Sequence, residues 1–406
     1  MSKVITDKKL IDELLNRWVD KIYPSKEDFK KASKSRKKLV IYHGVDPTAP
    51  DLHLGHSTNY LLLRKLQDLG HKIILLIGDF TAQIGDPTGR LTARKALTKK
   101  EVMENCKTYQ KQIGKILDFK SKKNPAKVKF NSQWLEKLKL EDIMKLAANF
   151  TQAQIIKRNM FQERLKKKEE IYLHEFLYPL FQGYDSVALN VDVEVGGTDQ
   201  TFNMLIGRDL IKIYKKKEKF VITTPLLINP KTGQKLMSKS EGSLVALDDP
   251  PNQIYGKVMA LPDEVILTCF ELCTGISLKE IQKISKGLKN KELNPRDAKA
   301  RLARDIVTIY HGKTVASNAE REFNRVFKEK KQPTKIPQVK IKVKQLPVLD
   351  LLAKTKLAPS KAEAKRLVEQ KGVKIDGKVV KDWKKEISVK SGMILQVGKR
   401  RFIKLA

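Results

Sequence analysis

With 406 residues, the chain is long enough for two to four domains, and its longest apolar run, 73–78, is far shorter than the roughly 20 residues that cross a membrane. Its 82 lysines and arginines against 46 aspartates and glutamates give a net charge of +36. This excess favours a polyanionic partner, although a general bias toward lysine would give the same composition. The three cysteines form no CxxC pair and the N-terminus has no apolar signal segment. We therefore expect a reducing, cytoplasmic location, no membrane association and no disulfide framework.

The first half of the chain alternates short apolar runs with helical patterns. Residues 38–44 and 72–78 are mostly apolar, as buried strands of a parallel sheet are. Between them, residues 54–69 have apolar side chains at helical spacing and end at Gly70, a residue typical of helix C-termini. Further elements in the same pattern are a helix over 98–117, an alternating strand over 187–197, a helix over 198–214 and a strand over 220–228. This alternation predicts an α/β fold whose ligands bind at the carboxyl ends of parallel strands.

The second half of the chain changes character. Residues 262–327 are helical and highly charged, and residues 328–344 contain two prolines and few apolar side chains, which indicates a linker. The tail then predicts an amphipathic helix over 361–370, a turn at Gly372 and short strands broken by Asp376-Gly377 and by Gly392. The last 66 residues hold 18 lysines and arginines against 6 aspartates and glutamates. A third of the net charge therefore lies in about a sixth of the chain.

Two histidines, His53 and His56, stand at the start of the predicted helix 54–69 in the sequence HLGH. At this spacing they face the same way, beside helix-end N–H groups that favour phosphate, and Gly55 between them lets a flat base approach the backbone. Such a site suits transfer at a nucleotide phosphate, where positioning and charge stabilisation do most of the work. A zinc pair would have the same spacing, but six histidines and no cysteine cluster leave too few further ligands. We therefore expect no zinc.

Lys235 and Lys239 lie on a loop over 231–243, between Gly233 and Gly242. Lysines on a glycine-hinged loop can close over a triphosphate and follow its charge onto departing pyrophosphate. Taken alone, this segment is better explained as a solvated basic loop. The HLGH and lysine–serine motifs, in this order on an α/β pattern, resemble the paired signatures of class I aminoacyl-tRNA synthetases.

Four further segments resemble the bacterial-type tyrosyl-tRNA synthetase family within that class. They are Tyr42 before GVDPT, IGDPTGR at 84–90, YPLFQGYD at 178–185 and VGGTDQTFN at 195–203. The resemblance spans nearly the whole chain and implies a Rossmann-like catalytic domain followed by helical and RNA-binding parts. The domains that it implies are a catalytic domain over 1–230, a mobile loop and helical anticodon-binding domain over 231–330, a linker over 331–346, and an RNA-binding domain of the ribosomal small-subunit type over 347–406.

The resemblance also implies a set of site residues. For tyrosine, it implies Tyr42 and Asp185 at the phenol, Asp86, Tyr178 and Gln182 at the ammonium, and Gln200 in the pocket lining. For ATP, it implies Gly44, Asp46, Thr48, His53, Gly55, His56, Gly197, Asp199, Lys239 and Ser240. The catalytic groups among or beside these would be His53, His56, Lys235 and Lys239, and the tRNA-binding residues would be Lys361, Lys365, Arg366 and Lys371. Phenylalanine would leave the acceptor Asp185 unpaired, which physical chemistry penalises.

The sequence departs from the family pattern at three positions near ATP. The usual lysine-methionine-serine-lysine-serine motif begins with Leu236 here, so Lys235 is displaced by one place. Whether Lys235 can serve as the first lysine stays open at this point. His43 and Asn59 stand where close relatives often have a cysteine and a threonine near the ribose.

The expected reaction joins tyrosine to ATP, which brings Mg²⁺, and gives tyrosyl-adenylate and pyrophosphate. The 3′ end of tRNA(Tyr) then accepts the tyrosine, and the resemblance implies a homodimer. Three alternatives stay open. They are a tryptophanyl enzyme with the same catalytic plan, a small nucleotidyltransferase with an HxGH motif, and an RNA-binding protein that has lost catalysis. A generic basic α+β domain also stays open for the tail.

Overall fold

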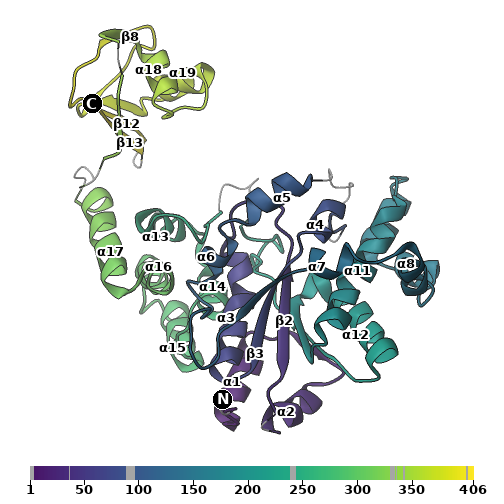
Figure 1. The fold of residues 1–406 in the computed structure, drawn as a ribbon. Helices are drawn as coiled ribbons and strands as arrows, with labels where there is room; N and C mark the ends of the chain where they lie inside the picture. Colours follow the sequence, from purple (N-terminus) through teal and green to yellow (C-terminus); the bar gives the residue numbers. More distant parts are fainter. Residues whose placement is uncertain are drawn as a thin grey trace. The chain divides into compact units, whose positions relative to one another are not determined.

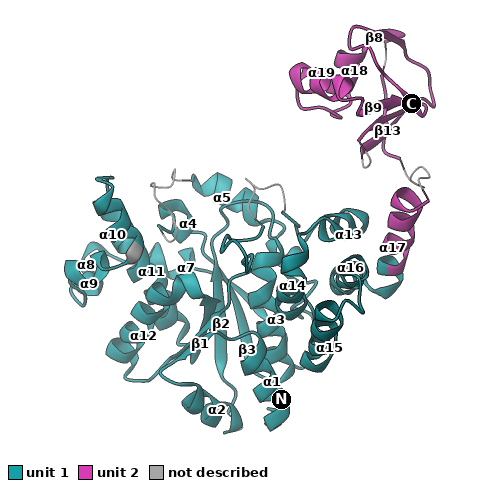
Figure 2. Cartoon of the chain, turned by 180° about the vertical axis from the view of Figure 1, so that it is seen from behind, with its two compact units in different colours: residues 1–316 teal, residues 317–406 magenta. Residues whose placement is uncertain are grey.

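The computed structural model describes residues 4–35, 37–87, 97–237, 244–329, 334, 336–341, 343–398 and 401–406. The chain divides into two compact units, residues 1–316 and 317–406 (Figure 2). The expected catalytic part and most of the expected helical part fall within the first unit, so the boundary at residue 230 stays a prediction. In the part of the chain that the structure describes, no helix is both long and apolar enough to cross a membrane.

A six-stranded sheet forms the centre of the first unit (Figure 1). Its order is β1 (Lys21–Tyr23), β6 (Phe220–Thr224), β5 (Val193–Gly197), β2 (Val40–Val45), β3 (Lys72–Ile77) and β4 (Lys127–Phe130). All neighbouring strands are parallel except β1, which pairs with β6 in the antiparallel sense. The predicted α/β fold is therefore confirmed. From β2 the chain goes to β3 on one side and later returns to β5 on the other, which makes the β2–β5 boundary the switch point where such sheets bind ligands.

Helices lie on both faces of this sheet, with α3 (Leu54–Asp68) and α14 (Ile266–Cys273) on one side and α11 (Leu173–Leu189) and α12 (Thr201–Lys215) on the other (Figure 1). Gly70, with a φ of 96°, follows α3 as expected. The pair α11 and α12 packs closely because Gly183 has no side chain, and a Cβ there would lie 2.9 Å from Leu210. This close contact holds the functional face of α11 against the sheet.

The remaining helices of the first unit are shorter or lie around this centre. They are α1 (Lys8–Arg17), α2 (Lys26–Lys34), α4 (Thr81–Ile84), α5 (Lys99–Cys106), α6 (Tyr109–Ile113), α7 (Ser132–Leu135), α8 (Leu140–Ala147), α9 (Gln152–Ile156), α10 (Asn159–Lys166), η1 (Thr198–Gln200), α13 (Pro251–Met259), η3 (Asp263–Val265), α15 (Leu278–Lys289) and α16 (Pro295–His311), with α17 (Lys313–Phe327) crossing the boundary between the units. The predicted helical character of 262–327 is confirmed.

Three predicted elements differ from the structure. The helix expected over 98–117 is two short helices, α5 and α6. The alternating residues that follow Val187 belong first to α11, whose C-cap Asn190 has the left-handed conformation, and strand β5 begins only at Val193. The strand expected over 220–228 ends at Thr224. The strand predicted from residue 187 was wrong in its first part, because a buried helix end also places apolar side chains two residues apart.

The second unit contains a five-stranded sheet of order β10 (Lys378–Val379), β9 (Val373–Ile375), β12 (Ile394–Val397), β13 (Arg401–Leu405) and β7 (Gln338–Val339), and the pair β11 (Glu386–Ser388) and β8 (Gln345–Pro347). Two helices, α18 (Val348–Lys354) and α19 (Lys361–Glu369), pack on its core with buried residues such as Leu351 and Val373. The expected helix and its following turns are confirmed, with Asp376, Gly377 and Gly392 at positive φ. Strand β7 lies inside the predicted linker, so Gln338 and Val339 belong to the sheet.

Candidate active site

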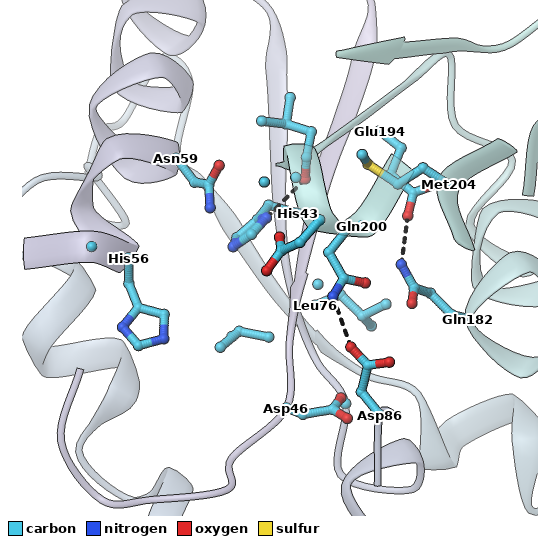
Figure 3. Close-up of a pocket in the computed structure, with 18 of the residues that line it drawn as sticks. His43, Asp46, His56, Asn59, Leu76, Asp86, Gln182, Glu194, Gln200 and Met204 are labelled. Carbon is cyan, nitrogen blue, oxygen red and sulfur yellow. Dashed lines mark hydrogen bonds between the residues drawn. The ribbon is translucent and has the colours of Figure 1, made fainter. Parts of the chain in front are cut away.

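A cavity of about 630 Å³ opens at the carboxyl ends of β2 and β5, where the strand order reverses (Figure 3). It brings together nearly all of the site residues that the sequence predicts. Those lining it are Tyr42, Gly44, Asp46, Thr48, His53, Gly55, His56, Asp86, Tyr178, Gln182, Asp185, Gly197, Asp199, Gln200 and Lys235. The other two residues predicted for tyrosine, ATP and catalysis, Lys239 and Ser240, lie outside the described residues.

The deep end of the cavity has two buried polar side chains, Tyr42 from β2 and Asp185 from α11. Asp185 accepts hydrogen bonds from Trp134 Nε1 at 2.8 Å and from Asn131 Nδ2 at 3.3 Å. Burial raises the pKa of Asp185, and the two donors act in the opposite direction. Because each donor holds one carboxylate oxygen, the orientation of Asp185 is fixed before any ligand enters.

Asn131 and Trp134 are site residues that the sequence reasoning missed. They follow β4, whose carboxyl end lies at the same edge of the sheet as the ends of β2 and β3. Strand β4 has the sequence KVKF, and its alternating lysines gave no signal of a strand in a parallel sheet. Had the strand been recognised, the polar residues directly after it would have been candidates for the site.

A second polar group lies beside this pair. Asp86 accepts from Gln200 Nε2 at 2.7 Å, and the Tyr178 hydroxyl donates to Asp46 at 2.9 Å. Burial raises the pKa of Tyr178 far above its ordinary value, so its hydroxyl keeps its hydrogen. The sequence placed Asp46 with ATP and Tyr178 with the amino acid. Their hydrogen bond therefore marks the boundary between the two predicted subsites.

His53 and His56 meet as the HLGH spacing predicts, with ring centroids 3.9 Å apart. His53 is the N-cap of α3, and its backbone N–H donates to His56 Nδ1 at 3.2 Å. The Nε2 atom of a neutral His56 then has the hydrogen, and the ring extends from α3 toward the cavity (Figure 3). Gly55 gives the pair room, because a Cβ there would lie 3.1 Å from the His53 ring.

The charge of His56 differs from the sequence expectation. Burial, and then the nearby His53, lower the pKa of His56 well below 6.5. His56 is therefore a neutral hydrogen-bond donor in the free protein, and it can stabilise charge on a phosphate through a hydrogen bond rather than through a charge of its own.

Lys235 reaches the cavity despite its displaced position in the loop motif. Its ammonium donates to Asp199 at 2.8 Å, and a β-bridge between Lys235 and Ile228 fixes the base of the loop. His43 and Asn59 also line the cavity. His43 Nδ1 donates to the Val195 carbonyl at 2.8 Å, and burial lowers its pKa, so His43 is a neutral part of the wall.

The predicted RNA-binding residues lie on or directly after α19 in the second unit. Three of them have acidic partners there: Lys361 pairs with Asp350 at 2.5 Å, Lys365 lies 3.8 Å from Glu369, and Arg366 lies 2.8 Å from Glu363. Lys371 follows the helix at a φ of 55° and is exposed.

The class of this protein follows from the sheet, the cavity and a family comparison. A model of the class I tRNA synthetases for tryptophan and tyrosine (W and Y) matches residues 34–328, and an S4 domain model matches residues 346–391. The chain is 45% identical to the tyrosine–tRNA ligase of Moorella thermoacetica, over 97% of this chain and 94% of that one. It is 43% identical to the tyrosine–tRNA ligase of Thermotoga maritima, over 99% of this chain and 98% of that one. The chain belongs to the tyrosyl-tRNA synthetase family.

Solved structures agree with this fold. A C-terminally truncated mitochondrial tyrosyl-tRNA synthetase of Aspergillus nidulans has a TM-score of 0.67 at 23% identity, over 79% of this chain and 95% of that one. The tyrosyl-tRNA synthetase of Archaeoglobus fulgidus has a TM-score of 0.61 at 22% identity, over 77% of this chain and 100% of that one. At these identities the likeness shows the fold alone.

The depressed pKa of His56 leads to a direct prediction. Histidine with an ordinary pKa is half protonated near pH 6.5, but a lowered pKa means that His56 loses its proton at a lower pH. In ¹⁵N-histidine NMR spectra, assigned by comparison with His56→Gln, we expect the His56 signal to show the neutral Nε2–H form at pH 6.5. A half-protonated signal at that pH, or the Nδ1–H form, would contradict the assignment.

Proposed function

We propose that this chain is a tyrosine–tRNA ligase. It activates L-tyrosine with ATP, giving tyrosyl-adenylate and pyrophosphate, and transfers the tyrosine to the 3′ end of tRNA(Tyr) in the cytoplasm. The observation that carries this function is one cavity that contains both the buried pair Tyr42 and Asp185 and the histidine pair of α3. The 45% identity to a tyrosine–tRNA ligase over nearly the full length of both chains supports it.

Tyrosine recognition rests on the deep end of the cavity. A phenol hydroxyl both donates and accepts, so it can donate to Asp185 and accept from Tyr42. Phenylalanine would offer no partner to the atoms of Tyr42 and Asp185 that face the ligand, a discrimination for which tyrosyl-tRNA synthetases are the standard example. An indole has one N–H donor and no acceptor, so tryptophan would satisfy only one of the two groups. Asp86, Tyr178 and Gln182 face the place where the amino group would lie.

The activation step needs placement more than proton transfer. The tyrosine carboxylate is already ionised and attacks the α-phosphate of ATP in line, so no general base is assigned. His56 donates through Nε2–H to the phosphate that is being attacked, and Thr48 and the Gly197–Asp199 turn line the nucleotide side. Lys235 must leave Asp199 when the nucleotide enters, which frees its charge for the pyrophosphate. Lys239 has the same role by resemblance to the family.

ATP would bring Mg²⁺ to the site, bound to its phosphates, as additional positive charge. Within the described residues, no group of three or more His, Cys, Asp and Glu side chains is placed to hold a metal ion.

The second unit would bind tRNA. Its S4 match includes Lys361, Lys365, Arg366 and Lys371, and such modules read RNA by shape and phosphate position. Three of these basic side chains pair with acidic neighbours but stay 46% or more exposed, so they remain accessible to phosphates. The helical region after the catalytic sheet would contact the anticodon. These two parts distinguish the chain from a small nucleotidyltransferase.

The proposed function predicts one outcome of an amino-acid panel. With ATP, Mg²⁺ and labelled pyrophosphate, tyrosine alone among the twenty amino acids should support ATP–pyrophosphate exchange, because it alone pairs both Tyr42 and Asp185. Exchange with tryptophan would agree with a class I synthetase but would contradict the roles assigned to Tyr42 and Asp185. If a folded protein gave no exchange with any amino acid but still bound tRNA, the non-catalytic RNA-binding alternative would be favoured.

A homodimer is also part of the proposal, and an apolar surface supports it. Large apolar side chains are exposed on α8, at the end of α10 and at the start of α11, which lie together at one end of the first unit (Figure 2). They are Leu140, Met144, Leu165, Tyr172 and Leu173, exposed by 40% or more, with Leu173 at 85%. Clusters of this kind mark interaction sites, and a second copy of the chain can cover them with the same surface.

Light scattering after gel filtration tests the dimer. We expect a mass of twice 46.4 kDa for the natural chain and of one copy for Leu140→Lys combined with Leu173→Glu. Ile213→Lys, on the exposed face of α12, serves as the matched control and should leave the dimer intact. A natural chain that is monomeric at working concentrations would contradict the proposal.

A further inference from the structure

A buried charged cluster lies behind Tyr42, and the mechanism above does not use it. Lys219, the residue before β6, is fully buried and forms an ion pair with Glu194 of β5. Its ammonium also donates to Ser186 Oγ at 2.8 Å. Ser186 Oγ in turn lies 2.9 Å from the Tyr42 hydroxyl oxygen. A continuous row of polar atoms therefore connects Lys219 to the deep end of the tyrosine pocket.

The fold makes room for this cluster. A Cβ at Gly207 of α12 would lie 2.7 Å from Lys219 Nζ and 2.9 Å from Ser186 Oγ, so only glycine fits without displacing them. A buried ion pair is weak evidence for stability, because apolar residues of similar volume often serve a core equally well. A function in the neighbouring pocket gives this pair a physical reason.

The direction of the hydrogen bonds follows from the donors present. A lysine ammonium only donates, so Ser186 Oγ accepts from Lys219 and must donate its own hydrogen elsewhere. Its two acceptor neighbours are Tyr42 at 2.9 Å and Glu194 at 3.3 Å. Glu194 already accepts from Lys219 and from Gln182 Nε2, and the shorter distance favours Tyr42. The Tyr42 oxygen is thus an acceptor on the side of Ser186. Its own hydrogen neighbours the Glu194 carboxylate and can turn to the cavity when a phenol enters.

We propose that Lys219 is a positioning residue that fixes the direction of the chain Lys219 to Ser186 to Tyr42, so that Tyr42 donates to the phenol oxygen of the substrate. The substrate hydroxyl then donates to Asp185. This inference rests on the proposed function, and it adds a specificity rule. A substituent at the para position must accept from Tyr42 as well as donate to Asp185. An aromatic amine donates to Asp185, but its second N–H would face the hydrogen of Tyr42.

The test compares tyrosine with 4-aminophenylalanine in ATP–pyrophosphate exchange. Lys219→Met combined with Glu194→Gln removes both charges together. The hydrogen bond between Ser186 and Tyr42 can then run in either direction. We expect the ratio of kcat/KM for tyrosine over 4-aminophenylalanine to fall about tenfold, the effect of one hydrogen bond, with the KM for ATP unchanged. Lys217→Met, which removes a nearby lysine paired with Asp192, is the matched control and should keep the natural ratio.

A second variant covers the case in which the double variant does not fold. Gly207→Ala keeps both charges and favours its helix, but its methyl group presses on Lys219 Nζ and Ser186 Oγ, so it should lower the same ratio. If both amino acids lost activity equally in whichever variants fold, the cluster would be merely structural and the inference would be wrong. If the natural chain gave no tyrosine-dependent exchange, the proposed function itself would have failed.

Discussion

The reversal of strand order between β2 and β5 is the constraint on which the site depends. Because the chain leaves these neighbouring strands toward opposite sides, no connection covers their carboxyl ends, and a crevice is left open there. The segment after β2 leads to the histidine pair at the start of α3, and the segment after β5 leads to Asp199 and Gln200. Gly78, at the end of β3, keeps the crevice accessible to Asp46, since a Cβ there would lie 2.0 Å from the carboxylate.

Within the crevice, the polar side chains are paired before a substrate arrives. Asp185 is held by Trp134 and Asn131, and Asp46 accepts from both Tyr178 and Thr81. Fixed dipoles of this kind need little reorganisation during a reaction, which is how electrostatic catalysis and selective binding are most effective. Under the proposed function the same rigidity would favour a hydroxyl, because a ligand that pairs with only one of Tyr42 and Asp185 leaves a polar atom of the other without a partner.

The sequence was most informative where local pattern and structure coincide. Residues 38–44 and 72–78 were recognisable as strands because both of their faces are buried, and HLGH predicted a paired histidine site because both residues lie in one helical turn. Strand β4 was missed because its lysines alternate, and Trp134 was missed with it. The partners of Asp185, the pairing of Lys235 with Asp199 and the neutral state of His56 depend on burial and on contacts between distant segments. Local sequence contains no signal for such contacts.

The central claim is that tyrosine lies with its ring in the deep end of this crevice and its carboxylate toward the histidine pair. A crystal structure of the chain with L-tyrosine tests this most directly. We expect the phenol oxygen within hydrogen-bond distance of both Tyr42 and Asp185, and the amino group beside Asp86 and Tyr178. Tyrosine bound in the reverse direction, or at a place away from Asp185, would contradict the account.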